Sequence, residues 1–193
     1  MMPGPPILPA NAALLLIDLQ QAIDHPSWGR RNNPQAESNV AALLAWWRHA
    51  GGPVYHVRHD STFTDSHYRP GQPGHHFKPG TAPVEGETVI AKRTNSAFVG
   101  TDLEARLRRA GQTTLVVAGV ITNNSVEATV RMAGNLGFAV YLVEDGCFTF
   151  DREDWNGVWR TAEEVHAMSL ANLSGEYAVV VRTRDILATG EGS

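Results

Sequence analysis

The chain has 193 residues, a formal net charge of −4 at pH 7 and a single cysteine, Cys147. This length predicts one domain over residues 1–193, and such a domain can bury about 70% of the surface that its unfolded chain exposes. One cysteine excludes an intramolecular disulfide and fits a reducing compartment. The acidic balance and the lack of a long lysine or arginine run exclude the electrostatic footprint of a nucleic-acid-binding protein.

The N-terminal segment MMPGPPILPANAALLLIDLQ predicts neither a signal peptide nor a membrane span. No basic residue precedes its apolar run, and Asp18 interrupts that run within eight residues of Ala12, whereas a span needs about 20 apolar residues. We therefore expect a cytoplasmic protein without a membrane partner. Small-molecule chemistry and protein interaction are the two function classes left open.

Six short apolar runs along the chain predict buried strands, and helical patterns separate them. Continuous β-branched runs are typical of parallel strands that are covered on both faces. Strands that alternate with helices predict an α/β fold, a six-stranded parallel sheet with helices on both faces in a Rossmann-like three-layer arrangement. The predicted strands are 12–18, 53–59, 87–92, 113–120, 139–145 and 177–181.

Four segments predict helices from their apolar periodicity, their starts and their glycine stops. They cover residues 36–51, 101–111, 125–137 and 161–175. In the second, Thr101 is the expected N-cap and Glu104 stands at the third helical position, which is the spacing of a capping box. The fourth repeats this start at Thr161.

Residues 60–86 show little periodicity and are rich in proline, glycine and histidine. A long irregular segment in a compact domain is usually functional or disordered. Its aromatic residues Phe63, Tyr68 and Phe77 favour a packed lid or an interface.

Chemically capable side chains follow the predicted strands at the edge where open parallel sheets bind ligands. Asp18 ends the first strand, Lys92 ends the short strand 87–92, and Ser125 follows the strand 113–120. A carboxylate, an amine and a hydroxyl should therefore meet at one edge although the chain separates them widely. The same reasoning places Glu144 and Asp145 at the end of the strand 139–145.

Each of these residues also has a purely structural interpretation. Asp18 or Ser125 could be a helix N-cap, because short oxygen-bearing side chains accept hydrogen bonds from the first turn of a helix. Lys92 could be an ordinary surface charge. His56 and His59 could bind a metal, but residues three apart on a strand point to opposite faces, which disfavours that role.

The segments ALLLIDLQQAI, VIAKRTNSAFVGTDLEARLRRAG, LVVAGVITNNSVEATVRMAGNLGF and YLVEDGCFTF resemble the isochorismatase-like cysteine hydrolases. This superfamily includes nicotinamidases, N-carbamoylsarcosine amidohydrolases and related amidases, and the resemblance spans about residues 12–181. It implies a catalytic triad of Asp18, Lys92 and residue 125. It also implies a non-proline cis peptide at Val120–Ile121 and an oxyanion hole formed by the backbone amides of Ile121 and Ser125.

The chain departs from the family pattern in one respect, because the family has cysteine where this chain has Ser125. The neighbouring residues otherwise follow the cysteine-bearing pattern, so we interpret the serine as a stand-in for a thiol, either engineered or natural. Cys147 lies on another segment and is expected to be buried and inert. A silent binding module or a vinyl-ether-cleaving isochorismatase are the alternative functions.

The resemblance also bears on cofactors and substrate. The nicotinamidase branch has an aspartate–histidine metal motif after the second strand, which HVRHDS does not match, so we expect no metal and no cofactor. The chain looks more like the metal-free branch that includes streptothricin hydrolase, which points to an amide, ureide or cyclic amide substrate. The candidate pocket residues are His59, His76, Phe77, Val120 and Asn124.

Large aromatic residues in polar surroundings predict a protein interface. Trp155 and Trp159 lie in the polar segment DREDWNGVWRTAEE, where isolated exposure would be unusual. With the aromatic residues of 60–86, they lead us to expect a homo-oligomer, a dimer or a tetramer.

Overall fold

The computed structural model describes residues 8–190. Its main sheet has six parallel strands in the order β3-β2-β1-β4-β5-β8. The strands are β1 (Ala13–Ile17), β2 (Val54–His59), β3 (Thr88–Lys92), β4 (Thr114–Val120), β5 (Ala139–Phe148) and β8 (Val179–Val181). The predicted fold class is confirmed.

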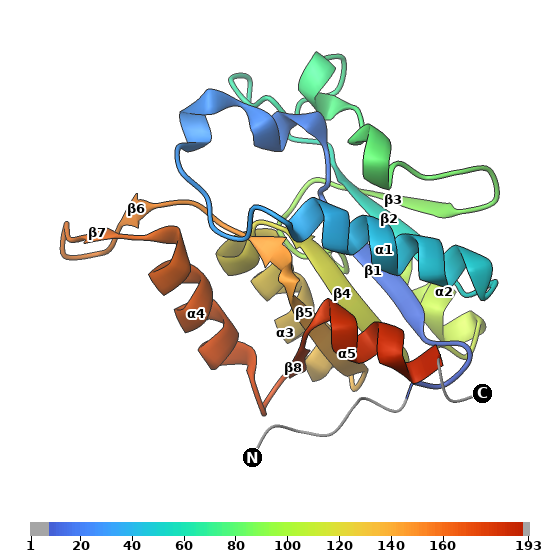
Figure 1. The fold of residues 1–193 in the computed structure, drawn as a ribbon. Helices are drawn as coiled ribbons and strands as arrows, with labels where there is room; N and C mark the ends of the chain where they lie inside the picture. The colour runs from blue at the N-terminus through green and yellow to red at the C-terminus, as the bar shows by residue number, and fades with distance from the viewer. Residues whose placement is uncertain (1–7, 191–193) are drawn as a thin grey trace.

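Helices cover both faces of this sheet (Figure 1). They are α1 (Ala36–His49), α2 (Leu103–Arg109), α3 (Glu127–Asn135), α4 (Ala162–Leu173) and α5 (Thr183–Leu187). On β1, Leu14 and Leu16 join the core under α1 and α5, whereas Leu15 and Ile17 join the core under α2, α3 and α4. Successive side chains of a strand point to opposite faces, so a wholly apolar β1 builds both cores at once.

Two details of the predicted elements are wrong. Thr101 does not cap α2; Asp102 takes the N-cap position without a side-chain cap bond, and Glu104 instead pairs with Arg108 one turn on. The strand predicted to end at residue 145 continues to Phe148, with a shift of register against β4. The expected start at Thr161 is confirmed, since Thr161 and Glu164 form a reciprocal capping box.

Because β5 runs past residue 145, its two carboxylates do not end the strand. Glu144 pairs with Arg182, and Asp145 accepts hydrogen bonds from the backbone and hydroxyl of Thr183. Both residues therefore anchor the start of α5, a helix that the sequence patterns did not predict, instead of joining the candidate site.

Several elements join the sheet and its helices. Short 3₁₀ turns lie at Gln21–Asp24, Pro26–Trp28, Pro73–His75, Pro79–Thr81 and Ala188–Gly190, and a π-turn lies at Thr122–Val126. A small antiparallel pair, β6 (Arg152–Glu153) and β7 (Trp159–Arg160), is separate from the main sheet. No helix of residues 8–190 is long and apolar enough to cross a membrane. Residues 1–7, on which part of the N-terminal interpretation rests, lie outside the described chain.

Candidate active site

Asp18 follows the last residue of β1 and turns away from the strand direction. Its φ of +51° is unusual for a residue other than glycine. The residue is 4% exposed, and its Oδ2 accepts a hydrogen bond from Lys92 Nζ at 2.6 Å, while Oδ1 has no hydrogen-bond partner among the described residues. The helix-cap interpretation is wrong, because Gln20 is the N-cap of the turn that follows.

Lys92 is the last residue of β3 and lies two strands away from β1, with β2 between them. Neighbouring strands lie about 4.8 Å apart, so only a long side chain reaches from β3 to the end of β1. Lys92 is 1% exposed, and its ammonium group donates to Asp18 and to the backbone oxygen of Thr94 at 3.1 Å. It is therefore not a surface charge.

Ser125 lies in the π-turn between β4 and α3, with its Oγ 3.3 Å from Lys92 Nζ. The N-cap interpretation is wrong here too: the N-cap of α3 is Val126, and no side chain caps the helix. The serine hydroxyl is thus left to face the lysine. The three residues that the sequence placed at one sheet edge do meet there.

The π-turn is held from the side of α4. Thr122 Oγ1 lies 2.9 Å from His166 Nδ1, and Ser169 Oγ donates to Thr122 O at 3.3 Å and to Glu127 Oε2 at 2.6 Å. Thr122, His166 and Ser169 are all buried. Because buried polar groups are costly to leave unpaired, this network fixes the turn that carries Ser125.

The peptide bond between Val120 and Ile121 is cis, as the family resemblance implies. Just before it, Gly119 lies directly against the backbone of β1: a Cβ on this residue would stand 2.2 Å from Ile17 O. Only glycine allows β4 to approach β1 so closely at this point, immediately before the turn to Ser125.

Burial sets the electrostatics of the site. Burial raises the pKa of Asp18 above its ordinary value, and the positive charge of Lys92 acts in the opposite direction. Burial and the charge of Lys92 lower the pKa of His59, whose Nδ1 lies 3.4 Å from Lys92 Nζ. Neutral His59 can thus accept from the ammonium group. Cys147 is buried as expected, and burial raises the pKa of its thiol to about 12.

A cavity of about 360 Å³ opens beside the π-turn, a volume at the small end of the range for ligand pockets. One wall is aromatic, because the rings of Trp28 and Phe150 stack 5.4 Å apart. Trp28 Nε1 donates to Ala22 O, and Asn123 Oδ1 accepts from Thr149, so both walls are braced. The lining residues are Ser27, Trp28, Ile121, Asn123, Asn124, Thr149, Phe150, Asp151, Arg152 and Glu153.

Of the residues predicted for the pocket, Asn124 lines this cavity. His59 lies beside Lys92, and Phe77 packs edge-on against His56. Val120 is fully buried in the core, and His76 is exposed on the loop. Sequence reasoning missed Trp28 and Phe150, and because it ended the strand at residue 145, no sequence signal placed Phe150 beside the site.

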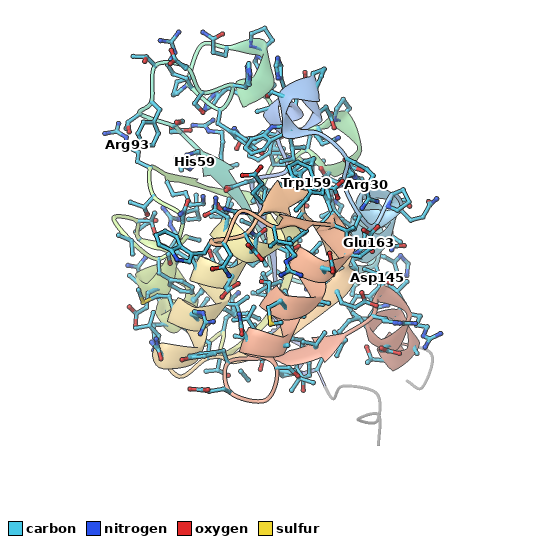
Figure 2. All side chains as sticks on the ribbon, turned by 90° about the vertical axis from the view of Figure 1, so that its left-hand side faces the viewer. Arg30, His59, Arg93, Asp145, Trp159 and Glu163 are labelled. Atoms are coloured by element: carbon cyan, nitrogen blue, oxygen red, sulfur yellow. The ribbon has the colours of Figure 1, made fainter. Side chains whose placement is uncertain are left out.

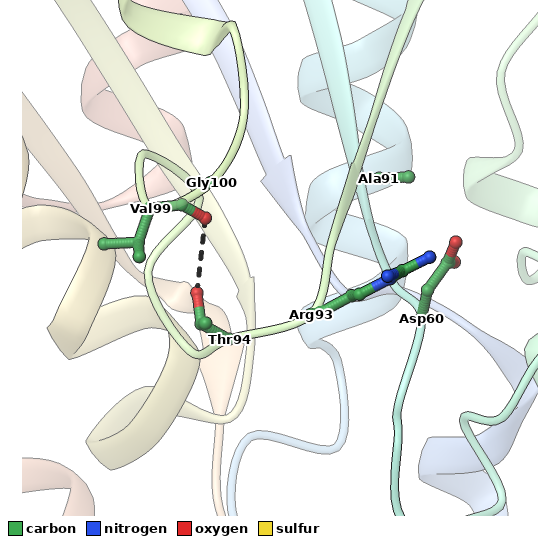
Figure 3. A pocket seen from close by; sticks show the side chains of 6 residues that line it. All are labelled: Asp60, Ala91, Arg93, Thr94, Val99 and Gly100. Atoms are coloured by element: carbon green, nitrogen blue, oxygen red, sulfur yellow. Dashed lines mark hydrogen bonds between the residues drawn. The ribbon is translucent and has the colours of Figure 1, made fainter.

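A second hollow, of about 390 Å³, lies around the end of β3 (Figure 3). It is lined by Asp60, Ala91, Arg93, Thr94, Val99 and Gly100, and a hydrogen bond from Thr94 Oγ1 to Val99 O crosses its wall. Asp18, Lys92 and Ser125 line neither hollow. The cavity beside the π-turn is the better candidate for substrate, because it is lined by Ile121 and Asn124, which belong to the segment that carries Ser125.

The histidines of β2 have structural partners. His56 Nε2 lies 2.8 Å from Glu87, on the opposite face of the strand from the site that His59 approaches. Among residues 8–190, no group of three or more histidine, cysteine, aspartate or glutamate side chains is arranged to hold a metal ion.

Comparisons with known proteins identify the family of this chain. The isochorismatase domain pattern matches residues 12–185. The chain belongs to the isochorismatase family. A solved isochorismatase-family protein from Chromobacterium violaceum is 65% identical, with a TM-score of 0.94 over 97% of this chain and 98% of that one.

Two curated relatives extend the comparison. The isochorismatase family protein YrdC of Bacillus subtilis is 38% identical over 91% of this chain and 94% of its own length. Streptothricin hydrolase of Streptomyces noursei is 34% identical over 72% of this chain and 50% of its own. The relatives of this isochorismatase-family chain thus include a protein that is named as a hydrolase.

Proposed function

We propose that this isochorismatase-family chain has the site of a hydrolase that cleaves the C–N bond of a small amide, ureide or cyclic amide. The observation that carries the proposal is the buried ammonium group of Lys92, which lies between the Asp18 carboxylate at 2.6 Å and Ser125 Oγ at 3.3 Å. Burying an ion pair costs free energy unless it is well partnered, so a structural role alone accounts poorly for it.

In the proposed reaction, Asp18 takes the proton of the nucleophile at position 125 as that atom bonds to the carbonyl carbon. The C–N bond then breaks, and Asp18 passes the proton to the leaving nitrogen. The product is an acyl-enzyme, which water hydrolyses with Asp18 again accepting and returning a proton. The backbone amides of Ile121 and Ser125 are the proposed donors to the oxyanion.

Serine makes this site weak. A thiol near a cation and a helix N-terminus loses its proton readily, whereas a hydroxyl is far less acidic. A barrier about 4 kcal/mol higher lowers a rate about 10³-fold. We propose that the Ser125 form binds substrate and turns it over slowly, whether the serine is engineered or natural.

The cavity beside the π-turn is the proposed place for the acyl group, because Ile121 and Asn124 of the segment that carries Ser125 line it. Its volume of about 360 Å³ and its stacked Trp28–Phe150 wall favour a small planar acyl group. Asn123 uses its oxygen to accept from Thr149, which leaves its amide N–H groups to donate to a substrate oxygen. A cyclic amide of the streptothricin type is one member of this class.

Restoring the thiol tests the proposal. Ser125→Cys should raise ammonia or amine release from a panel of primary amides, ureides and cyclic amides by about 10³-fold or more. Ser96→Cys is the matched control, because Ser96 and Ser125 are similarly buried, at 8% and 7% exposure, and only Ser125 contacts Lys92. The control should leave the rate unchanged.

Adding Asp18→Asn to Ser125→Cys should abolish the gain, because an amide cannot accept the proton. If Ser125→Cys shows no turnover and no acylation of the thiol by intact-mass measurement, the hydrolase proposal is wrong. The alternative function, a catalytically silent binding module, would then be favoured, because the cavity would remain without a working nucleophile beside it.

A further inference from the structure

The hollow of about 390 Å³ around the end of β3 has no part in the proposed reaction, yet charged and apolar groups line it together. Asp60 and Arg93 supply the charges, and Ala91 and Val99 supply apolar surface. β3 is the edge strand of the main sheet, so no further strand of this sheet covers the hollow. Figure 2 shows Arg93 at the margin of the molecule, on the opposite side from Glu163 at the start of α4. The hollow is therefore separate from the surface beside α4.

One charge of the hollow is balanced and the other is not. Asp60 Oδ1 accepts a hydrogen bond from Arg58 Nε at 2.9 Å and lies 2.7 Å from His75 Nε2. Burial opposes ionisation of Asp60, but the contacts with His75 and Arg58 outweigh it and lower the pKa of this carboxyl, so it stays an anion with partners. Arg93 forms no ion pair with any of residues 8–190. Its guanidinium group is the unbalanced charge of the hollow.

The side chain of Arg93 is directed across the hollow. Figure 3 shows it extending from the end of β3 toward Asp60. His59 and Lys92 are partners in the register of β2 and β3, so Asp60 and Arg93 are the next residues along the two strands. Because side chains alternate between the faces of a sheet, Arg93 leaves β3 on the opposite face from Lys92. The hollow thus holds a cation that the candidate active site does not use.

We propose that this hollow binds a small monocarboxylate with a short, branched apolar body, its carboxylate paired with Arg93 and its carbon chain against Ala91 and Val99. The planar fork of a guanidinium group fits a carboxylate with two parallel hydrogen bonds. Val99 is 42% exposed, so a ligand there removes apolar surface from water. The volume lies at the small end of the range for ligand pockets, which limits the chain to a few carbons.

The charges of the hollow disfavour other ligands. A phosphate ester or a nucleotide carries more than one negative charge, and Asp60 on the facing wall would repel the second. An amine would be repelled by Arg93, while Asp60 already has Arg58 and His75 as partners. An uncharged ligand would leave the guanidinium group of Arg93 unpaired. One negative charge on an apolar body is the chemistry that remains.

The hollow shares its backbone with the candidate active site. Thr94 lines the hollow, and its backbone oxygen accepts from Lys92 Nζ at 3.1 Å. Asp60 N donates to Lys92 O at 2.8 Å. A carboxylate on Arg93 therefore brings a negative charge close to the lysine that acts on residue 125. This charge should raise the pKa of a thiol at position 125 and slow its alkylation, by a factor on the order of two because solvent screens the interaction.

This coupling gives the hollow a regulatory role. Hydrolysis of an amide releases a carboxylate together with the amine, so the acid product of the reaction has the chemistry that the hollow selects. A carboxylate that accumulates would then slow the enzyme from outside the substrate cavity. This last step rests on the proposed function, whereas binding in the hollow and its effect on the thiol do not.

NMR titration of the full chain with isovalerate tests the binding site without any turnover. The backbone amide signals of Thr94, Val99 and Gly100 should shift and saturate, with a dissociation constant in the millimolar range, which is typical of a ligand with about seven non-hydrogen atoms. The alcohol 3-methylbutan-1-ol keeps the carbon chain without the charge, and it should bind at least tenfold more weakly. No saturable shift with isovalerate, or equal binding of the alcohol, would overturn the proposal.

Two arginines distinguish this hollow from the substrate cavity. Arg93→Gln should weaken isovalerate binding at least tenfold, and Val99→Asp, which adds a negative charge to the wall, should weaken it as well. Arg152→Gln is the matched control, because Arg152 is also exposed and lines the cavity beside the π-turn. It should leave the dissociation constant unchanged. The reverse pattern would place the carboxylate in the substrate cavity and contradict the proposal. Circular dichroism of each variant separates loss of binding from loss of folding.

Alkylation of Ser125→Cys by iodoacetamide tests the coupling. Saturating isovalerate should slow the reaction about twofold, and Arg93→Gln should remove this effect of isovalerate. Binding in the hollow with no change in alkylation would contradict the coupling. Both measurements are independent of hydrolysis, so a Ser125→Cys protein that binds isovalerate but shows no turnover would contradict the proposed function and leave the binding site standing.

Discussion

The strand-edge site and the arm of residues 152–160 beside α4 differ in how far their side chains are exposed to solvent. At the strand edge, Asp18 and Lys92 are 4% and 1% exposed, and they lie at the ends of β1 and β3, on either side of β2. On the arm, Trp155 is 98% exposed and the charges lie in solvent. Buried charges keep one geometry because water cannot replace their partners, whereas an exposed aromatic tip is held by little until something packs on it. The first region suits chemistry and the second suits association.

The largest expected effect on stability comes from replacing a glycine at the strand edge, and a glycine on the arm provides the comparison. Gly119→Ala would place a Cβ 2.2 Å from Ile17 O at a φ of +130°, so two strands would have to separate. We expect a loss of at least about 3 kcal/mol of unfolding free energy, or no folded protein. Gly157→Ala on the arm meets no atom within 4 Å, although its φ of +76° disfavours alanine.

Chemical denaturation measures both variants. For Gly157→Ala we expect a loss of about 1 kcal/mol, the cost of a left-handed residue other than glycine. Equal losses for the two variants would mean that the close approach of β4 to β1 does not constrain the site.

The pH dependence of turnover should come from the strand edge alone. Burial raises the pKa of Asp18 above its ordinary value of 3.8, and the base works only when it is ionised. In the Ser125→Cys protein, kcat/KM should therefore fall as the pH falls through this raised pKa, by about tenfold for each pH unit below it. Stopped assays across the pH range measure the profile.

An exposed carboxylate supplies the control for this profile. Asp102 pairs with Arg106 on the surface of α2, which lowers its pKa, and Asp102→Asn should leave the acid limb in place. An acid limb at or below the ordinary carboxylate range would show that Asp18 is not the base whose ionisation the reaction needs.

The smallest effect belongs to the ion pairs at the base of the arm. Arg30 is 52% exposed and pairs with Asp151 and Glu163, which connects the Trp28 turn to the start of α4. Exposed pairs are screened by salt and contribute little. Arg30→Gln should lower Tm slightly at low ionic strength and not at all at high ionic strength, as differential scanning calorimetry can measure. A large loss that persists in salt would show that this pairing holds the fold.

The sequence predicts the strand-edge region well because its signals are local. Six apolar runs mark the strands, and parallel strands bring their carboxyl ends to one edge, so Asp18, Lys92 and Ser125 could be placed together without a structure. Their distances could not, because these depend on the strand order that puts β2 between Lys92 and Asp18. The π-turn at Thr122–Val126 has no signature that separates it from an ordinary helix start.

The arm region is poorly predicted because its signals are weak. Strands of two residues, such as Trp159–Arg160, carry no periodicity. β5 ends three residues later than predicted, because Gly146 to Phe148 continue the strand after a shift of register. No alternation of polar and apolar residues in the sequence indicates this shift. Trp155 and Trp159 still stood out as large aromatic residues in a polar segment, which is a signal of association and not of secondary structure.

The charge that Lys92 brings to residue 125 is the centre of this account, and the pH dependence of alkylation in Ser125→Cys measures it most directly. Iodoacetamide should modify this thiol with a pKa well below the ordinary thiol value of about 8.5, while the buried Cys147 stays unmodified. Adding Lys92→Met should return the pKa to the ordinary range or above it, whereas Lys78→Met, which removes a lysine paired with Asp24 and Glu37, should not. A thiol at position 125 that titrates in the ordinary range, with or without Lys92, would contradict the account.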